Sequence, residues 1–187
     1  MATTPGHLFV ISAPSGTGKT TVVHELQRRL PQLADSVSCT TRAPRPNERD
    51  GVDYHFISHQ QFQEMIAAQA FVEWAPVYDN FYGTPKKPLE TWRAAGRDVI
   101  LDLDIQGAAA VKQYDPSATL IFLAPPSLEI LAARLRGRGT EDPATLERRL
   151  QRAAEEMAAR DRYDHVIVND DIQTTCDALL RILQPRV

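Results

Sequence analysis

Cysteine and long apolar runs are scarce in this sequence, and each scarcity excludes a class of protein. The only two cysteines, Cys39 and Cys176, stand far apart in 187 residues and lack the spacing of a metal site. We therefore expect free thiols in a reducing compartment rather than a disulfide scaffold. No apolar stretch approaches the length of a membrane span, and the opening MATTPGH lacks the features of a signal peptide. These absences predict a cytoplasmic protein.

Basic residues are not in excess either. The 21 Lys and Arg are outnumbered by 24 Asp and Glu, for a formal net charge of -3. This balance argues against nucleic acid or a membrane surface as a partner. The five histidines form no ligand pattern, and the sequence has no internal repeats. A hydrophobic content of 43% suits one globular domain with a sizeable core, and the sequence indicates no oligomeric state.

A strand, a glycine-containing turn and a helix start follow one another in residues 8–21, LFVISAPSGTGKTT. The P-loop pattern ends in Gly-Lys-Ser/Thr, and residues 13–20 fit it, with alanine where its first glycine is usual. Gly16 and Gly18 let backbone N–H groups converge on phosphate oxygens, and the helix adds its positive dipole end. We therefore expect a nucleoside triphosphate to be bound by Ala13, Pro14, Ser15, Gly16, Thr17, Gly18, Lys19, Thr20 and Thr21.

Two further positions suit magnesium. The Lys19 charge serves the β and γ phosphates, and the Thr20 hydroxyl is placed to ligate the ion. Asp102 and Asp104 end the apolar strand DVILDL, where a P-loop enzyme places a carboxylate for the magnesium shell. Alternate strand residues point to opposite faces, so we expect different tasks for the two, with Asp102 at the metal. The alternative is a solvated pair at the end of a strand.

Apolar strand patterns alternate with helical patterns over most of the chain, which predicts an α/β protein with a parallel sheet. In the helix that Ser127 caps, Leu128, Leu131 and Leu135 are expected to line one face. Expected strands lie near 8–12, 54–57, 71–78, 98–103, 119–124 and 165–168, and expected helices near 19–30, 58–66, 89–95, 106–113, 127–135, 143–157 and 171–183.

Residues 36–57 change character and read as an insertion into this pattern. Arg42 and Arg45, with Tyr54 and Tyr82, could surround an acceptor that is itself a phosphate monoester, because arginine binds phosphate in a bidentate manner. Alone, the arginines would more often form a solvated basic face. Glu73 interrupts an apolar strand, and its carboxylate could accept from the N1 and N2 donors of guanine. The alternative is an outward-facing strand residue.

Arg134, Arg138 and Arg149 lie in or beside the charged break RLRGRGTEDP at 134–143. This break could form a mobile lid whose arginines stabilise a transferring phosphoryl group and exclude water. A basic edge of an amphipathic helix is the alternative interpretation.

Together these segments resemble guanylate kinase, the ATP:GMP phosphotransferase. The resemblance runs from about residue 8 to about residue 171, in the family's order: APSGTGKTT, SVSCTTRAPRPNERDGVDYHF, FVEWA, YGTP, ILDLDIQG, FLAPPS, RLRGRGTE and VIVNDD. The second block is far more specific than the P-loop, which many NTPases share. The resemblance implies a P-loop NTPase-type three-layer α/β fold in one domain, with a core of about 1–34, 84–133 and 162–187, a GMP-binding α+β insertion of about 35–83, and a mobile lid with its following helix of about 134–161.

By matching motif, the resemblance also implies residue roles. ATP would be held by the P-loop, Arg134, Arg138 and Asn169, with Arg149 against the transferred group. GMP would contact Ser38, Arg42, Arg45, Tyr54, Glu73, Tyr82, Thr84 and Asp104, with the arginines and tyrosines on its phosphate and the others on guanine. The expected catalytic set is Lys19, Arg42, Arg138 and Arg149, with Mg²⁺ at Thr20 and Asp102. Ala13 departs from the family pattern, and Thr84 in place of a serine keeps the hydroxyl.

The implied reaction is direct in-line transfer of the γ-phosphoryl of Mg-ATP to GMP, giving ADP and GDP in purine metabolism. A phosphate monoester has a second pKa near ~6, so the nucleophile needs no general base. Two other readings stay open. One is a non-catalytic guanylate-kinase-like module that binds phosphopeptides, against which the intact Lys19 and Thr20 argue. The other is a kinase with a ribose bisphosphate acceptor, against which Ser38, Glu73 and Thr84 argue.

Overall fold

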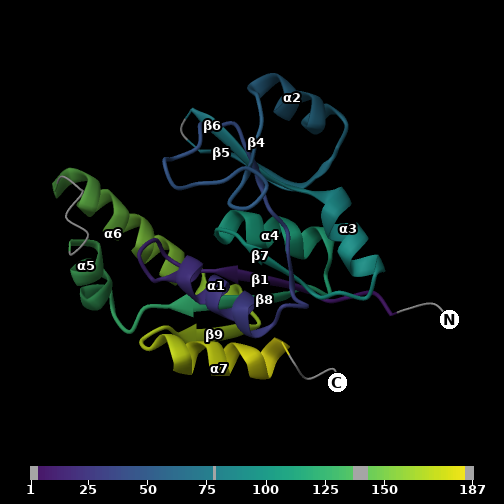
Figure 1. Ribbon diagram of the computed structural model, residues 1–187. Helices are drawn as coiled ribbons and strands as arrows, with labels where there is room; N and C mark the ends of the chain where they lie inside the picture. The colour runs from purple at the N-terminus through teal and green to yellow at the C-terminus, as the bar shows by residue number, and fades with distance from the viewer. Residues whose placement is uncertain (1–3, 78, 137–142, 184–187) are drawn as a thin grey trace.

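A five-stranded parallel sheet with strand order β2-β7-β1-β8-β9 forms the centre of the protein (Figure 1). The computed structural model describes residues 4–77, 79–136 and 143–183. The strands are β1 Leu8–Ser12, β2 Ala34–Asp35, β7 Val99–Asp102, β8 Thr119–Ala124 and β9 His165–Val168. All four neighbouring pairs are parallel, which confirms the predicted α/β fold class.

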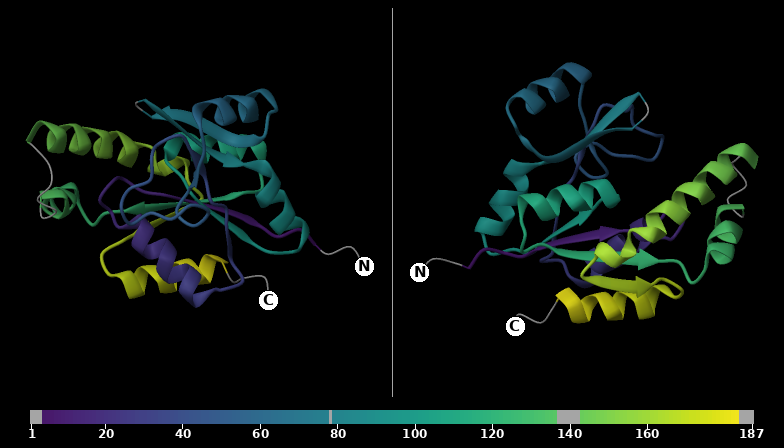
Figure 2. Two further views of the ribbon diagram at one scale, coloured as in Figure 1. Left: turned by 45° about the horizontal axis from the view of Figure 1, so that its top comes forward. Right: turned by 180° about the vertical axis from the view of Figure 1, so that it is seen from behind.

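Side chains of β1 alternate between two helical layers. Leu8 and Val10 pack with residues of α3 (Lys86–Ala94) and α4 (Ile105–Tyr114). Phe9 and Ile11 pack with residues of α1 (Lys19–Arg29) and α7 (Ile172–Leu183). All four β1 side chains are at most 3% exposed, because a strand covered on both faces is apolar throughout. Figures 1 and 2 show the resulting three layers.

The insertion has its own sheet and its own small core. Strands β3 Cys39–Thr40, β4 His55–Phe56, β5 Phe71–Val77 and β6 Asn80–Pro85 follow the order β4-β3-β6-β5. Helix α2, His59–Ala67, begins with a capping box of Ser58 and Gln61. The Phe62 ring, fully buried, stacks on Phe71 and Phe81 with centroid distances of 4.5 and 5.4 Å.

Helices α5 (Leu128–Arg136) and α6 (Pro143–Ala158) pack against each other at one end of the sheet (Figure 1, left). Leu131 and Leu135 contact Ala153 in this interface, and Ser127 caps α5 by accepting from the N–H of Ile130 at 3.2 Å. The prediction that Leu128 shares their face is wrong, because Leu128 is 41% exposed. A short 3₁₀ helix, η1 at Arg160–Arg162, leads from α6 to β9.

Two further details differ from the sequence-based expectations. Strands β2, β3 and β6 are not among the expected strands; β2 and β3 have only two residues, which are too few to show alternation. Asp104 does not lie on a strand: β7 ends at Asp102, and Asp104 is the N-cap of α4, accepting from the N–H groups of Gln106 and Gly107. The different tasks of the two carboxylates therefore follow from a strand end and a helix start, not from two faces of one strand.

The domain boundaries remain a prediction. The boundary expected at residue 134 falls inside α5. Among the described residues, no helix combines the length and apolarity needed to cross a bilayer.

Candidate active site

The loop between β1 and α1 has the backbone that its glycines predict. Gly16 and Gly18 have φ of 93° and 99°, a region that side chains disfavour. Gly18 is the N-cap of α1, so the first N–H groups of this helix face the loop. Ala13 has no positive φ, which explains why alanine is accommodated where glycine is usual. The loop therefore has a conformation that could bind phosphate, with a helix N-terminus behind it.

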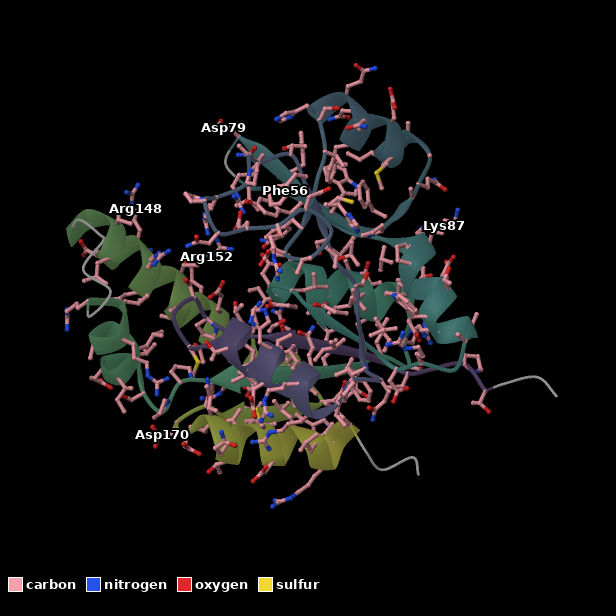
Figure 3. The ribbon with its side chains drawn as sticks, in the orientation of Figure 1. Phe56, Asp79, Lys87, Arg148, Arg152 and Asp170 are labelled. Atoms are coloured by element: carbon pink, nitrogen blue, oxygen red, sulfur yellow. The ribbon has the colours of Figure 1, made fainter. Side chains whose placement is uncertain are left out.

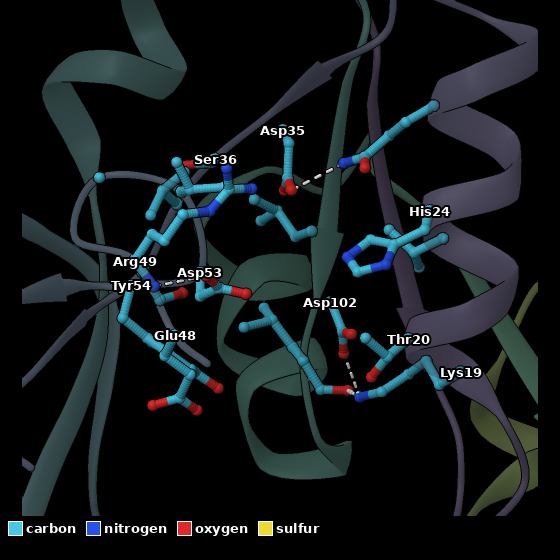
Figure 4. Close-up of a pocket in the computed structure, with 18 of the residues that line it drawn as sticks. Lys19, Thr20, His24, Asp35, Ser36, Glu48, Arg49, Asp53, Tyr54 and Asp102 are labelled. Carbon is cyan, nitrogen blue, oxygen red and sulfur yellow. Dashed lines mark hydrogen bonds and ion pairs between the residues drawn. The ribbon is translucent and has the colours of Figure 1, made fainter. Parts of the chain in front are cut away.

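Lys19 and Asp102 meet at the carboxyl end of the sheet (Figure 4). The Lys19 ammonium forms an ion pair with the Asp102 carboxylate and donates to the Leu103 carbonyl at 3.0 Å. Because β1 pairs with β7, with Ile11 beside Asp102, the P-loop that follows β1 emerges next to that carboxylate. The predicted phosphate-binding lysine and the predicted metal-binding carboxylate, Lys19 and Asp102, thus share one site.

Thr20 and Asp102 offer the hard oxygen atoms that Mg²⁺ prefers, and both line the cavity beside Lys19. Within residues 4–77, 79–136 and 143–183, no cluster of three or more acidic, His or Cys side chains could enclose a metal. This fits magnesium, which in kinases is held by one or two protein oxygens, water and substrate phosphates rather than by a protein cage. The donor set therefore fits a magnesium ion carried in with a nucleotide.

Arg134 and Asn169 lie on the other side of the P-loop. The Arg134 Nη1 donates to the Asn169 carbonyl at 3.1 Å. The Asn169 amide donates to the Thr17 carbonyl at 2.6 Å and accepts from the Thr175 hydroxyl at 3.0 Å. Asn169 is only 5% exposed, so its side-chain amide supports the P-loop from the interior of the protein. Both residues, with Gly18 and Thr21, line a hollow of about 340 Å³.

Arg42 is held rigidly in the insertion. Its Nη1 and Nη2 donate to the two carboxylate oxygens of Glu48, each at 2.9 Å, and its Nε donates to the Tyr82 hydroxyl at 3.1 Å. The guanidinium lies 5.6 Å from the ring centre of Tyr54 and 5.8 Å from that of Phe56. Glu48, through its hydrogen bonds, raises the pKa of Arg42, whereas Arg42 lowers the pKa of Glu48. The pair is therefore ionised at neutral pH.

Polar side chains gather where β5 and β6 meet the start of α4. The Thr84 hydroxyl donates to Glu73 Oε1 at 2.6 Å and lies 3.5 Å from the Ser38 hydroxyl. A Cβ atom on Gly107 would lie 3.4 Å from Glu73 Oε2, so that carboxylate faces the first turn of α4, beside Asp104. Burial, and then the nearby Asp104 charge, raise the pKa of Glu73, against the Thr84 hydrogen bond. Glu73 is thus not the outward-facing residue of the alternative interpretation.

A cavity of about 740 Å³ joins the P-loop to the insertion. Lys19, Thr20 and Asp102 line it from the core, and Ser38, Arg45 and Tyr54 line it from the insertion. Figure 4 shows Tyr54 and Glu48 across this cavity from Lys19. The two groups of predicted residues therefore face each other across one space, although they come from separate sheets.

One face of α6 looks onto the P-loop from the opposite side. Arg149 and Arg152, with the P-loop, line a second hollow of about 690 Å³. Arg152 bridges two carboxylates, Asp104 at 3.5 Å and Glu156 at 3.2 Å. Glu156 is 6% exposed, burial raises its pKa, and its Oε2 has no hydrogen-bond partner among the described residues. Figure 3 shows Arg148 and Arg152 on the side of α6 turned toward the insertion.

The structure brings most of the predicted residues to these hollows, with exceptions. Arg42, Glu73, Tyr82 and Thr84 are not among the residues that line the three hollows described above. Arg138 lies outside the described residues. Asn169 lines the hollow beside Arg134, but its side chain is hydrogen-bonded to Thr17 and Thr175. Sequence reasoning missed Glu48 and Arg152. Glu48 stands in the same basic, Pro-rich segment as Arg42, and Arg152 follows Arg149 by three residues and so shares its helix face, but neither spacing reveals the contact made.

Known proteins resemble the chain closely. A family model described as guanylate kinase matches residues 6–186. Guanylate kinase of Gloeobacter violaceus is 51% identical over 94% of this chain and 86% of its own length, and that of Carboxydothermus hydrogenoformans 49% over 95% and 87%. A crystal structure of guanylate kinase from Anaplasma phagocytophilum has a TM-score of 0.79 at 35% identity, covering 98% of this chain and 87% of that one. A shikimate kinase from Bacteroides thetaiotaomicron, at 15% identity and a TM-score of 0.51 over 95% and 98% of the two chains, shares the fold alone.

Proposed function

The chain belongs to the guanylate kinase family, and we propose that it transfers the γ-phosphoryl group of magnesium-bound ATP to the phosphate of GMP across the cavity between the P-loop and the insertion. The products are ADP and GDP. The relatives favour neither a phosphopeptide-binding module nor a ribose bisphosphate kinase.

The observation that carries the assignment of sites is the shared cavity. One wall holds Lys19, Thr20 and Asp102, and the other holds Ser38, Arg45 and Tyr54. A phosphoryl donor bound by the first group and an acceptor phosphate bound by Arg45 and Tyr54 of the second would face each other across this cavity. Such an arrangement supplies the positioning on which phosphoryl transfer mainly depends.

On the donor side, we assign the triphosphate to the backbone N–H groups of residues 13–21 and to Lys19. Lys19 would leave its partner Asp102 for the β and γ phosphates, which frees Asp102 and the Thr20 hydroxyl to hold magnesium. The ion, when bound, neutralises charge on these phosphates. Arg134 beside the loop would contact the nucleotide, and Arg149 would lie against the transferred group from α6.

On the acceptor side, we assign the GMP phosphate to Arg42, Arg45, Tyr54 and Tyr82. Guanine has two adjacent N–H donors, and the Glu73 carboxylate offers acceptors for them, with Asp104 Oδ2, which Arg152 also contacts at 3.5 Å, as a further acceptor. The other Asp104 oxygen, Oδ1, is occupied by two backbone N–H groups of α4. Ser38 and Thr84 complete this polar wall.

The chemistry needs no general base. The second pKa of a phosphate monoester is about 6, so the attacking oxygen is largely ionised at neutral pH. The main barriers are repulsion between two anionic substrates and competition from water. Cationic side chains from the P-loop, the insertion and α6 offset the first, and closure over both nucleotides would exclude the second.

We also infer a cytoplasmic location. Both cysteines of the sequence, Cys39 and Cys176, are buried free thiols, which suits a reducing compartment.

The test is ADP release from Mg-ATP with GMP, AMP, CMP, UMP or no acceptor. We expect release above background with GMP, because Glu73 and Asp104 are matched to guanine donors. Equal release in all five reactions would refute a guanine-selective kinase.

Lys19→Ala should abolish most turnover while circular dichroism stays unchanged. Lys87→Ala is the matched control, because Lys87 is an exposed lysine on α3, away from the P-loop in Figure 3.

A further inference from the structure

Glu48 has no part in the assignments above, yet its carboxylate forms an ion pair with the Arg42 guanidinium. Its two carboxylate oxygens accept from Nη1 and Nη2 in a fork at 2.9 Å each. The two side chains are only 17% and 16% exposed. A bidentate pair of this kind fixes the plane of the guanidinium as well as its position.

The N–H groups of Arg42 can be counted. A guanidinium carries five. Nε donates to Tyr82, Nη1 donates to Glu48 and to the carbonyl of Ala43 at 2.7 Å, and Nη2 donates to Glu48. One N–H, on Nη2, remains for a ligand. Arg42 is therefore not a free cation that wraps around a phosphate, but a fixed group that offers one donor in a set direction.

Tyr82 is set by the same chain of contacts. Its oxygen accepts the Nε–H of Arg42 at 3.1 Å, which leaves its own O–H proton for another acceptor. The Tyr54 ring packs edge-on against Tyr82 at 5.8 Å and stacks near the Arg42 guanidinium. The orientation of two donors, one from Arg42 and one from Tyr82, thus depends on where the guanidinium is held.

Glu48 also holds the backbone of the same loop. Its Oε2 accepts from the N–H of Arg45 at 2.8 Å, and its own N–H donates to the Arg45 carbonyl at 3.0 Å. The Arg45 side chain, by contrast, is 73% exposed, with its guanidinium 3.9 Å from Glu48. The two arginines of the segment therefore differ: Arg42 is preset, and Arg45 can still move onto a ligand.

We propose that Glu48 is a positioning residue for the acceptor phosphate, which fixes Arg42 so that one Nη2 N–H and the Tyr82 O–H remain directed at that phosphate. The inference rests on the proposed function, because it takes the acceptor to be GMP. The negative charge of Glu48 offsets the positive charge of Arg42. The gain in affinity for the phosphate therefore comes from pre-organised geometry rather than from added positive charge.

Glu48→Gln tests this role. An amide has one acceptor oxygen and one NH₂ group, so one arm of the Arg42 fork would face a donor and the fork would open. Binding is measured by calorimetry with GMP and with guanosine, which has the base but no phosphate. We expect the affinity for GMP to fall about 10- to 100-fold, as for a lost charge-assisted hydrogen bond, and that for guanosine to stay within about twofold. Glu64→Gln on α2, an exposed glutamate whose side chain accepts from Gln60, is the matched control.

Four results would overturn the inference. If Glu48→Gln binds GMP as tightly as the wild type, Glu48 has no role in binding. If it binds GMP more tightly, Glu48 competes with the phosphate for Arg42. An equal loss for guanosine would make it a general support of the insertion. Additive effects of Glu48→Gln and Tyr82→Phe on GMP affinity would show that Glu48 does not act through the Arg42–Tyr82 contact.

Should Glu48→Gln lose its circular dichroism spectrum, Glu48→Asp replaces it. Aspartate keeps the charge but withdraws the carboxylate by one methylene, so the same phosphate-dependent loss is expected, and unchanged GMP binding would refute the role. Wild-type turnover separates this inference from the proposed function. Binding of GMP without phosphoryl transfer would refute the function alone, and transfer with normal GMP binding by the Glu48 variant would refute the inference alone.

Discussion

Replacing Glu73 with glutamine tests how the site would select its base. In the structure, Glu73 Oε1 accepts from the Thr84 hydroxyl at 2.6 Å, and Oε2 faces the first turn of α4. Both oxygens are acceptors, which matches the adjacent N1 and N2 donors of guanine. Glutamine would keep the size of the side chain but would present an NH₂ group where one acceptor is needed.

The size of the effect follows from the hydrogen bond that is lost. A hydrogen bond to a charged group is worth about 1.5–3 kcal/mol, which corresponds to about 10- to 150-fold. We expect kcat/KM for GMP to fall by this factor. The value for AMP should stay constant or rise, because adenine lacks the N1 donor and is rejected by the unpaired carboxylate. Coupled ADP-release assays with both nucleotides measure the ratio, and Glu64→Gln should leave it unchanged. An unaltered GMP-to-AMP preference in Glu73→Gln would refute this role of Glu73.

The same residue predicts a pH dependence. Burial raises the pKa of Glu73 above 4.5, with Asp104 adding to the shift. An acid with a raised pKa takes up a proton at a higher pH than usual, so acidification should protonate Glu73 and raise KM for GMP before pH 4.5 is reached. The phosphate of GMP titrates near pH ~6, and therefore the difference between wild type and Glu73→Gln is the quantity to measure. Parallel pH profiles would contradict the prediction.

Three further changes test the loop, the α6 contact and the insertion. Gly16→Ala should lower stability by about 1–2 kcal/mol in thermal melts, because φ is 93° and a Cβ would lie 2.6 Å from Leu135; an unchanged melting temperature would contradict the strain. Arg152→Gln should raise KM for GMP up to about fivefold, which corresponds to the energy of an exposed ion pair such as that with Asp104. The control Arg148→Gln should leave KM unchanged. Equal effects of the two changes would exclude a specific role for the Arg152–Asp104 contact. Phe62→Ala should cost about 3–5 kcal/mol in urea unfolding, as for a buried aromatic ring, and a loss below about 1 kcal/mol would show that the insertion core can collapse around the gap.

Elements with strong local patterns could be predicted from the sequence. Strands β8 and β9 and helix α7 match the expected ranges closely, because long apolar runs and helical periodicity are set by nearby residues. The two-residue strands β2 and β3 carry no such signal, since their pairing depends on partners far along the chain. The prediction for Leu128 is wrong for a related reason. Helical spacing shows which residues share a face of the helix, but it does not show how much of that face the partner helix α6 buries.

The candidate site divides in the same way. The P-loop is local, so its glycine conformations and its helix start could be predicted residue by residue. The contacts of Arg152 with Asp104, 48 residues away, and of Asn169 with Thr17, 152 residues away, depend on tertiary packing. Glu48 is only six residues from Arg42, yet the pairing depends on a loop without regular structure, for which spacing rules do not exist.

Topology explains why a locally built donor site and an inserted acceptor site share one cavity. In a parallel sheet all carboxyl ends lie at one edge. The P-loop follows β1 at this edge, Asp102 ends β7 there, and the insertion leaves the sheet directly after β2, at Asp35. The chain returns through β6, which ends at Pro85 immediately before α3. The insertion is thus attached to the core at two places, after β2 and before α3, so a change in the acceptor residues can alter selectivity while the strands that position Lys19 and Asp102 keep their register.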